Sequence, residues 1–519
     1  MLISGHRQKN DKQNKSNLLI IPMSNYGRIK IKQEKQYIAV DLGAESGRVM
    51  LGTVSAEKLV LEEMHRFDNV PIEKDGVLRW DFEALLSEVK SGISKAAKHT
   101  DKEIAGIGVD SWGAGMGLID EQGELIENPY HYRSSTVEMM EKAYEFMPKR
   151  RIYENTGLQF MQFNDIYRLL EMRLSNYQPL AKAKNIIFMA DLFSYHLCGE
   201  MFGEYTLVGC SQLLDMRTGQ WSKEIFDKLS LPLKKMPKIV KPGTVVGRLT
   251  ESVAEELGCE RIPFIAVPSH DTASAVAAVP ATGGDNWAYL SCGTWSLIGA
   301  EVPGAIINDK TFDYDFTNEG GVDNTIRLLK NVMGLWLVQE CRRHWQSQGF
   351  ELSYGELTEM AQKASAFMAY VDPDCNEFFA PCDMPARINK YLTETQQGTI
   401  EDKGQMVRVV LESLSLKARL ILERIEDVTS KKIEVLHIVG GGIQNELLCQ
   451  FTASATGKKV VAGPVEATAS GNILMQARAA GQIKTLAQLR QIVANSFDLK
   501  EYQPQDTELW QKQYEKINK

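Results

Sequence analysis

Short apolar runs alternate with amphipathic stretches along most of the chain, which is the pattern of an α/β protein. Apolar runs predict strands near residues 37–40, 59–67, 104–109, 261–267 and 435–439, and another that begins at residue 288. Apolar residues that recur every three or four positions predict helices over 82–98, 329–345 and 406–428. In such folds ligands gather at the ends of strands, so the loops that follow these strands are the first places to look for chemistry.

The strand over 37–40 runs into a small-residue turn that contains Asp41, Gly43, Gly47 and Arg48. The two glycines are expected to give a tight backbone that points N–H groups at an anion. Asp41 ends the strand, where it could hold a hydrated Mg²⁺, and Arg48 could counter phosphate charge. An ordinary hairpin with a solvated acid is the alternative interpretation.

The segment 288–296 repeats this layout, an apolar strand followed by glycine and hydroxyl residues, and so suggests an internal duplication with two matched phosphate turns. Further on, Gly440, Gly441 and Gly442 follow the strand over 435–439 and precede a helical run, which is suited to a nucleotide. A dehydrogenase is the alternative, but its G-x-G-x-x-G pattern needs glycine where Asn445 stands.

At 519 residues the chain exceeds what one hydrophobic core usually supports, so two domains with a ligand cleft between them are expected. The net charge of −8, with no basic stripe after residue 36, argues against nucleic acid as a partner. The sequence contains no run of about 18 apolar residues, so no membrane span is predicted. The eight scattered cysteines favour reduced thiols in a cytoplasmic protein, and residues 1–36 are expected to form a loose extension.

The sequence lacks the Walker A, H-E-x-x-H and G-x-S-x-G motifs, so phosphate binding would depend on the two glycine turns. A phosphoryl-transfer enzyme also needs an acceptor pocket and a carboxylate that takes the proton of the attacking alcohol. Asp271, beside His270 at the end of a predicted strand, is the candidate base. A turn or a helix cap is the alternative role for this pair.

Several motifs, in this order, resemble those of the FGGY carbohydrate kinases, and within the family they are most similar to the L-rhamnulokinases. They are Asp41-Leu-Gly-Ala-Glu-Ser-Gly-Arg48, Ser269-His-Asp-Thr-Ala-Ser-Ala275, Ser291-Cys-Gly-Thr-Trp-Ser296, Thr317-Asn-Glu-Gly-Gly321, Leu329-Lys-Asn-Val-Met-Gly-Leu-Trp336, Val439-Gly-Gly-Gly442 with Asn445, and Ala462-Gly-Pro-Val-Glu-Ala467. The resemblance implies an α/β, actin-like (ribonuclease H-type) fold of two domains with a catalytic cleft between them. The expected domains are 37–278 and 279–497, with 498–519 as a C-terminal tail.

The resemblance also implies roles for individual residues. ATP would be contacted by Ala44, Glu45, Ser46, Gly47, Arg48, Thr294, Asn331, Gln339 and Gly441, and Asp41 would hold Mg²⁺ through water. The ketose would be bound by Gly113, His270, Asp271 and Thr272, with Asp271 as the base that lets O1 attack the γ-phosphate. Closure of the two domains would exclude water.

The implied reaction is ATP-dependent phosphorylation of O1 of a 6-deoxy-L-ketohexose, with L-rhamnulose as the first expectation. Two departures bear on the sugar: Gly115 stands where rhamnulokinases usually have an aspartate, and Ser134 where an acid commonly follows the arginine. Losing an acceptor can shift preference among hydroxylated substrates. L-fuculose and other ketoses are therefore alternatives, as is a catalytically weak sugar sensor. A monomer or small homo-oligomer is expected.

Overall fold

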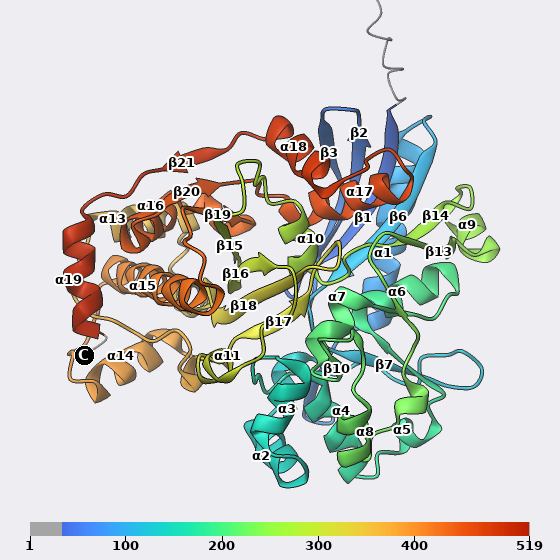
Figure 1. Cartoon of the computed structure of the whole chain (residues 1–519), viewed down its shortest axis with the longest axis horizontal. Coiled ribbons are helices and arrows are strands. Elements are labelled where there is room, and N and C mark those ends of the chain that lie inside the picture. The colour runs from blue at the N-terminus through green and yellow to red at the C-terminus, as the bar shows by residue number, and fades with distance from the viewer. Residues whose placement is uncertain (1–33, 518–519) are drawn as a thin grey trace, which may run out of the picture.

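The computed structural model describes residues 34–517. Most of the predicted loose extension, residues 1–33, lies outside the described residues. The first strand, β1 (Lys35–Leu42), begins two residues before the domain start that the sequence suggests. Two mixed β-sheets, each covered by helices, organise the rest of the described chain (Figure 1).

The first sheet has six strands and is built around β1, which is buried along almost its whole length. In spatial order the strands are β13 (Thr244–Arg248), β14 (Pro263–Ala266), β6 (Ile104–Ser111), β1, β2 (Ser46–Val54) and β3 (Leu59–Asp68). The β1 strand pairs antiparallel with β2 and parallel with β6. A strand enclosed in this way must be apolar on both faces, which explains its continuous apolar run.

The second sheet has seven strands and repeats the arrangement of the first. In spatial order they are β17 (Thr317–Gly320), β18 (Ile326–Met333), β16 (Trp295–Val302), β15 (Trp287–Cys292), β19 (Val435–Val439), β20 (Lys459–Ala462) and β21 (Lys500–Tyr502). Here β15 pairs antiparallel with β16 and parallel with β19, just as β1 pairs with β2 and β6. The topology thus confirms the matched layout that the two glycine turns predict.

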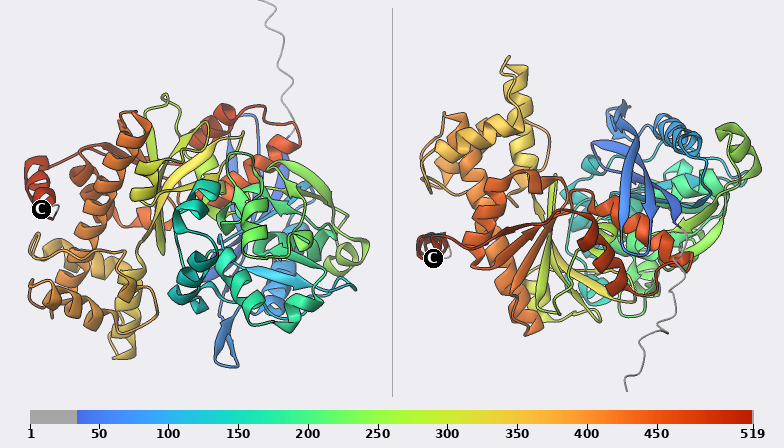
Figure 2. Two further views of the ribbon diagram at one scale, coloured as in Figure 1. Left: turned by 60° about the horizontal axis from the view of Figure 1, so that its bottom comes forward. Right: turned by 90° about the horizontal axis from the view of Figure 1, so that it is seen from above.

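Helices of both halves pack on these sheets, and the halves are shown from further sides in Figure 2. Those on the first sheet are α1 (Phe82–His99), α6 (Met189–Cys198) and α10 (Asp271–Ala277). Helix α9 (Glu251–Leu257) packs on α1, and α7 (Tyr205–Val208) packs on β17 of the second sheet. Those of the second half are α11 (Asp309–Asp313), α12 (Trp336–Ser347), α13 (Tyr354–Lys363), α14 (Met384–Glu394), α15 (Lys403–Thr429), α16 (Glu446–Thr456), α17 (Ala467–Ala479), α18 (Leu486–Ser496) and α19 (Thr507–Ile517). The second half is not confined to its own sheet, because α17 packs against β1, β6 and α10.

A smaller lobe, shown in green tones in Figure 1, is inserted between β6 and β13 and has its own apolar cluster. Its helices are α2 (Val137–Phe146), α3 (Lys149–Thr156), α4 (Asp165–Leu174), α5 (Gln178–Lys182) and α8 (Lys223–Lys228). Short strand pairs join them: β7 (Met116–Ile119) with β8 (Asn185–Phe188), β10 (Leu214–Asp215) with β11 (Gln220–Trp221), and β9 (Gly203–Glu204) with β12 (Ile239–Val240). One more pair, β4 (Ile72–Lys74) with β5 (Val77–Arg79), follows the first sheet's meander.

The helix predicted over 329–345 is wrong in its first part, because Ile326–Met333 is strand β18. This strand lies between β16 and β17 and is mostly buried, so its apolar residues need not alternate with polar ones. Helix α12 begins only at Trp336, after Gly334, whose N–H donates to the carbonyl of Thr294. A Cβ at Gly334 would lie 2.7 Å from Ser296 Oγ, so the chain turns there in close contact with the second glycine turn.

Residues at the C-terminal end of the described chain belong to the second half. Strand β21 pairs with β20, and α19 packs on α16. Between residues 34 and 517, no helix is long and apolar enough to cross a membrane.

Candidate active site

A cavity of about 300 Å³ lies between the two halves and is lined by residues of both sheets and of the inserted lobe. The predicted site residues that line it are Asp41, Ala44, Arg48, Gly113, His270, Asp271, Thr272, Thr294, Asn331 and Gly441. The predicted residues that lie outside its lining are Glu45, Ser46, Gly47 and Gln339. Residues more than 200 positions apart in sequence thus meet in one cleft.

The first glycine turn joins β1 to β2, and its charged residues pair across the hairpin. Asp41 lies opposite Arg48, and Asp41 Oδ2 accepts hydrogen bonds from Arg48 Nε at 3.0 Å and Nη2 at 2.7 Å. Arg48 Nη1 lies 2.5 Å from Glu466 Oε2, which comes from the second half. Although burial opposes it, the Asp41 and Glu466 carboxylates raise the pKa of Arg48. Arg48 is therefore bound by two carboxylates and can meet a phosphate only by sharing or leaving them.

The two glycines of this turn serve packing more than backbone freedom, because neither has a positive φ. A Cβ at Gly47 would lie 2.3 Å from the ring of Phe67, and a Cβ at Gly43 would lie 3.0 Å from the carbonyl oxygen of Ser46. Glu45 at the tip is exposed and forms an ion pair with Arg343 of α12. Its carboxylate therefore links the two halves at the rim of the cleft.

Three carboxylates converge where β1, β6 and α10 meet. Asp110 is the register partner of Asp41 on β6 and is completely buried, with Asn472 Nδ2 of α17 at 2.5 Å from its Oδ2. Burial, followed by the nearby Asp41 and Asp271 carboxylates, raises the pKa of Asp110 well above its usual range. Such a group favours a bound cation or proton in its neighbourhood.

Asp271 is the first residue of α10, directly after the loop that leaves β14. Its Oδ1 accepts from the Thr272 backbone N–H at 2.5 Å and from Thr272 Oγ1 at 3.1 Å, and it lies 3.4 Å from His270 Nε2. Burial, with a smaller contribution from Asp41, raises the pKa of Asp271, while His270 and Thr272 act in the opposite direction. About one third of the side chain is exposed, so it can reach a ligand.

The loop that carries His270 and Asp271 is held in place by hydrogen bonds at Ser269. The buried carboxylate of Glu204 accepts from the Ser269 N–H at 3.0 Å, and Ser269 O accepts from the Ser111 N–H at 2.8 Å. Gly113 faces the imidazole so closely that a Cβ there would lie 2.8 Å from His270 Nε2. Only glycine fits beside His270 in its observed position.

The second glycine turn, between β15 and β16, contains Thr294 and lines the same cavity as the first. Asn331 on β18 is bound by Gln159 of the inserted lobe, which accepts from the Asn331 N–H at 2.8 Å. Gly441 has open space around its Cβ position, whereas a Cβ at Gly442 would lie 2.2 Å from Cys292 Sγ. This segment therefore presents bare backbone to the cavity at Gly441, where a flat ligand could lie against it.

Sequence reasoning missed Asp110, Glu466, Glu319 and Arg327, all of which lie in or next to the site. Asp110 had a usable signal, because it ends an apolar strand as Asp41 does. Glu319 and Glu466 stand in motifs noted only for their similarity to a family, and Arg327 stands in none of the motifs. The contacts of all three depend on tertiary structure. All eight cysteines lie in the described part of the chain and are free.

Comparison with known proteins gives a consistent result. Models of the N-terminal and C-terminal domains of the FGGY family of carbohydrate kinases match residues 36–278 and 288–480. The chain is 42 % identical over 482 residues to a rhamnulokinase of Bacteroides thetaiotaomicron, a match that covers 93 % of this chain and 98 % of the relative. It is 36 % identical over 471 residues to a rhamnulokinase of Bacillus subtilis, covering 91 % and 96 %.

Solved structures confirm the predicted actin-like, two-domain α/β fold. A gluconate kinase from Lactobacillus acidophilus superposes with a TM-score of 0.78 at 18 % identity, over 94 % of this chain and 97 % of that one. A Plasmodium falciparum glycerol kinase with ADP superposes with a TM-score of 0.73 at 15 % identity, over 93 % and 97 %. With family models over both halves and relatives above one third identity along nearly the whole length, the chain belongs to the FGGY family of carbohydrate kinases and is an ATP-using sugar kinase.

Proposed function

We propose that the protein is a rhamnulokinase, which transfers the γ-phosphate of ATP to O1 of L-rhamnulose and releases L-rhamnulose 1-phosphate and ADP. The observation that carries this proposal is the similarity to rhamnulokinases along more than nine tenths of the chain. The geometry supports it, because one cavity joins the Asp271 carboxylate to both glycine turns.

In the proposed reaction Asp271 accepts the O1 proton, and the freed electron pair of O1 forms the bond to the γ-phosphorus. The bond from phosphorus to the bridging oxygen breaks, and its electron pair leaves on ADP. His270 and Thr272 hold the carboxylate, and Gly113 leaves room for the sugar beside the imidazole. Arg48 and the turn at Thr294, which both line the cavity, would contact the phosphates.

The residues present fit the Mg²⁺ that the family implies. Asp41 lines the cavity, and among residues 34–517 no hydrogen-bond donor reaches its Oδ1, while Oδ2 is held by Arg48. Carboxylate oxygens and water are the ligands that Mg²⁺ prefers. Bound there, the ion would neutralise charge on the ATP phosphates. We propose that Asp41 holds it through water.

The departures at Gly115 and Ser134 do not argue against L-rhamnulose, because both residues lie outside the cavity lining. Behind the cavity wall, Asp165 of α4 is buried, and its Oδ1 accepts from the Gly115 N–H at 2.8 Å. A carboxylate thus lies beside position 115 although it comes from another element. Ser134 Oγ accepts from Arg168 at 3.0 Å in the same layer.

The experiment that tests the proposal is a coupled ADP-release assay with Mg-ATP and L-rhamnulose, L-fuculose, L-xylulose, L-ribulose or D-xylulose, ranked by kcat/KM. We expect the highest value with L-rhamnulose. The highest value with another ketose would replace the proposed sugar, and no activity with any of them would favour a sugar sensor. A domain boundary near residue 278, Mg²⁺ as the metal and a cytoplasmic location are part of the same proposal.

A further inference from the structure

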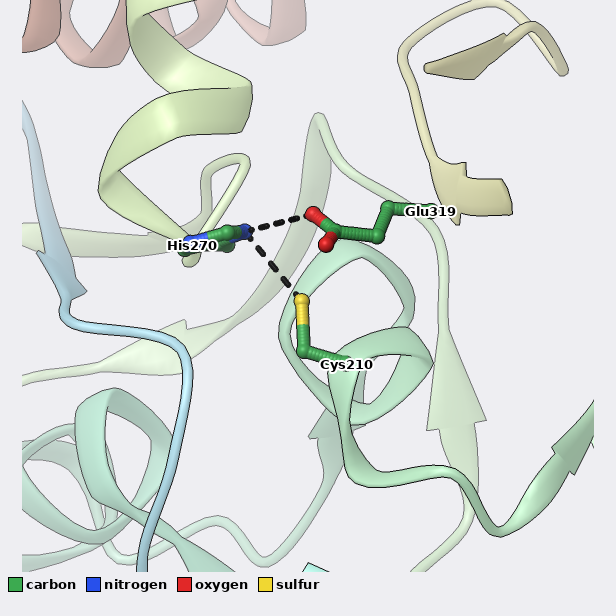
Figure 3. Close-up of side chains that lie close together, drawn as sticks. All are labelled: Cys210, His270 and Glu319. Atoms are coloured by element: carbon green, nitrogen blue, oxygen red, sulfur yellow. Dashed lines mark hydrogen bonds and ion pairs between the residues drawn. The ribbon is translucent and has the colours of Figure 1, made fainter. Parts of the chain in front are cut away.

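His270 contacts a buried ion pair, Glu319 with Arg327, that has no role in the proposed reaction. Glu319 of β17 and Arg327 of β18 are both buried, and Arg327 Nη2 lies 3.1 Å from Glu319 Oε2. His270 Nδ1 lies 3.3 Å from that oxygen and 3.2 Å from Cys210 Sγ (Figure 3). The imidazole is therefore fixed by the second sheet and by η2 (Gly209–Ser211), although it stands on the loop after β14.

The cluster of Cys210, His270 and Glu319 has the ligand types and spacing of a metal site, since their ligand atoms lie within 4.8 Å of one another. The guanidinium of Arg327 makes this cluster unfavourable for a metal ion. Arg327 Nη2 lies 3.1 Å from both His270 Nδ1 and Glu319 Oε2, where it already compensates the carboxylate. Although burial opposes it, Arg327 lowers the pKa of Glu319 to about 2, so the pair is ionised. A cation would have to displace a fixed positive charge.

The same contact decides where the imidazole carries its proton. An arginine nitrogen can only donate a hydrogen bond, so a guanidinium nitrogen 3.1 Å from His270 Nδ1 requires that Nδ1 accept. The sulfur of Cys210 lies 3.2 Å from that nitrogen, but its thiol can donate to the Thr206 carbonyl oxygen at 3.3 Å, so this contact does not decide the tautomer. If Nδ1 instead carried a hydrogen and donated it to Glu319, that hydrogen would lie close to the one on Arg327 Nη2, and the two would repel each other.

We propose that Arg327 is a positioning residue that holds His270 as the neutral tautomer with its proton on Nε2. That nitrogen faces Asp271 Oδ1 at 3.4 Å and lies at the wall formed by Gly113. The imidazole then donates a hydrogen bond at the reacting end of the pocket, and Asp271 remains the proton acceptor there. In the opposite tautomer, a lone pair on Nε2 would face the carboxylate and repel it.

The tautomer can be read without any substrate, in the full chain labelled with ¹⁵N-histidine, from two-bond correlations between ring protons and ring nitrogens. Loss of one signal set in His270→Gln assigns His270. His131 gives an internal reference, because its Nδ1 accepts from the Arg133 backbone N–H at 3.1 Å and must carry its proton on Nε2. We expect His270 to give the same pattern as His131 at neutral pH.

Variants then test whether Arg327 is the cause. Arg327→Met should move the proton of His270 to Nδ1, toward Glu319, and lower kcat about 10- to 100-fold with little change in KM for ATP. Arg327→Met/Glu319→Gln removes both buried charges, so its folding does not depend on an unpaired carboxylate. Arg490→Met, which removes another buried ion-paired arginine, should leave the His270 pattern unchanged.

A proton on Nδ1, or an imidazolium, in the unsubstituted protein overturns the proposal. An unchanged His270 pattern in Arg327→Met overturns the role of Arg327. The inference rests on the proposed function only for what the hydrogen bond does in catalysis. Because the spectrum is recorded without sugar or ATP, a wrong sugar in the activity assay would leave the tautomer result standing.

Discussion

Replacing Gly471 by alanine should displace the carboxylate of Asp271, the proposed base, although Gly471 does not line the cavity. Gly471 lies on α17 against α10, and a Cβ there would lie 1.9 Å from the carbonyl oxygen of Ser274. This is about 1.5 Å short of ordinary van der Waals contact, and backbone cannot yield as a flexible side chain can. Ser274 lies on the short helix that begins at Asp271, so moving that helix displaces the carboxylate.

Two magnitudes follow for Gly471→Ala. Overpacking at a buried contact costs about 1–3 kcal/mol of unfolding free energy, and a misplacement of about 1 Å at a reacting group can lower the rate about 100-fold. Urea unfolding and kcat in the ADP-release assay measure the two effects. Gly355→Ala on α13 is the control, because the nearest atom to its Cβ lies at 3.9 Å and helix propensity alone should make it neutral or stabilising by up to about 1 kcal/mol. Wild-type kcat and stability in Gly471→Ala would refute the reasoning.

Four further predictions concern single carboxylates. Asp271→Asn should lower kcat about 10²- to 10⁴-fold while calorimetry finds the sugar Kd unchanged, and a retained kcat would remove Asp271 as the base. Because burial raises the pKa of Asp271 and only the ionised form accepts a proton, kcat/KM should fall as the pH drops through that raised value; an acid limb centred at or below about pH 4 contradicts this. Burial raises the pKa of Asp165 to about 7, so between about pH 4 and 7 this carboxyl ionises in the unfolded state but stays protonated in the folded state, and the free energy of unfolding falls as the pH rises. Asp165→Asn should therefore gain Tm relative to the parent over that range, and a constant Tm difference argues against this. Glu45→Gln should change stability by no more than about 1 kcal/mol and leave KM for ATP nearly unchanged, since the exposed carboxylate pairs with Arg343; a large rise in KM would show that the carboxylate itself serves ATP.

The sequence was sufficient for the parts of the fold that depend on local pattern. The apolar run before Asp41 predicts β1, and its repeat from residue 288 predicts β15 and the layout of the second sheet. The pattern failed at β18, because a strand buried on both faces has no alternation and Leu329 and Met333 also fit a helical spacing. Spacing alone cannot separate these two cases.

Only those residues of the candidate site that stand in a recognisable sequence motif were predictable. Asp41, Asp271 and Thr294 line one cavity, as the family resemblance implies. The partners of these residues come from distant segments: Glu466 reaches Arg48 from the second half, and Asn472 binds Asp110. Such pairings are decided by how α17 crosses the first sheet, and no local pattern encodes that crossing.

The repeated strand order of the two sheets has a consequence for the electrostatics of the cavity between them. In the first sheet the hairpin holds the ion pair of Asp41 and Arg48, whereas the matching position of the second sheet pairs the neutral residues Ser291 and Leu297. Two nearly equivalent frameworks therefore differ in electrostatic character across their shared boundary. Fixed charges therefore gather at the first hairpin, whereas uncharged backbone and hydroxyl groups predominate at the second. The near-symmetric scaffold thus has a single electrostatic polarity.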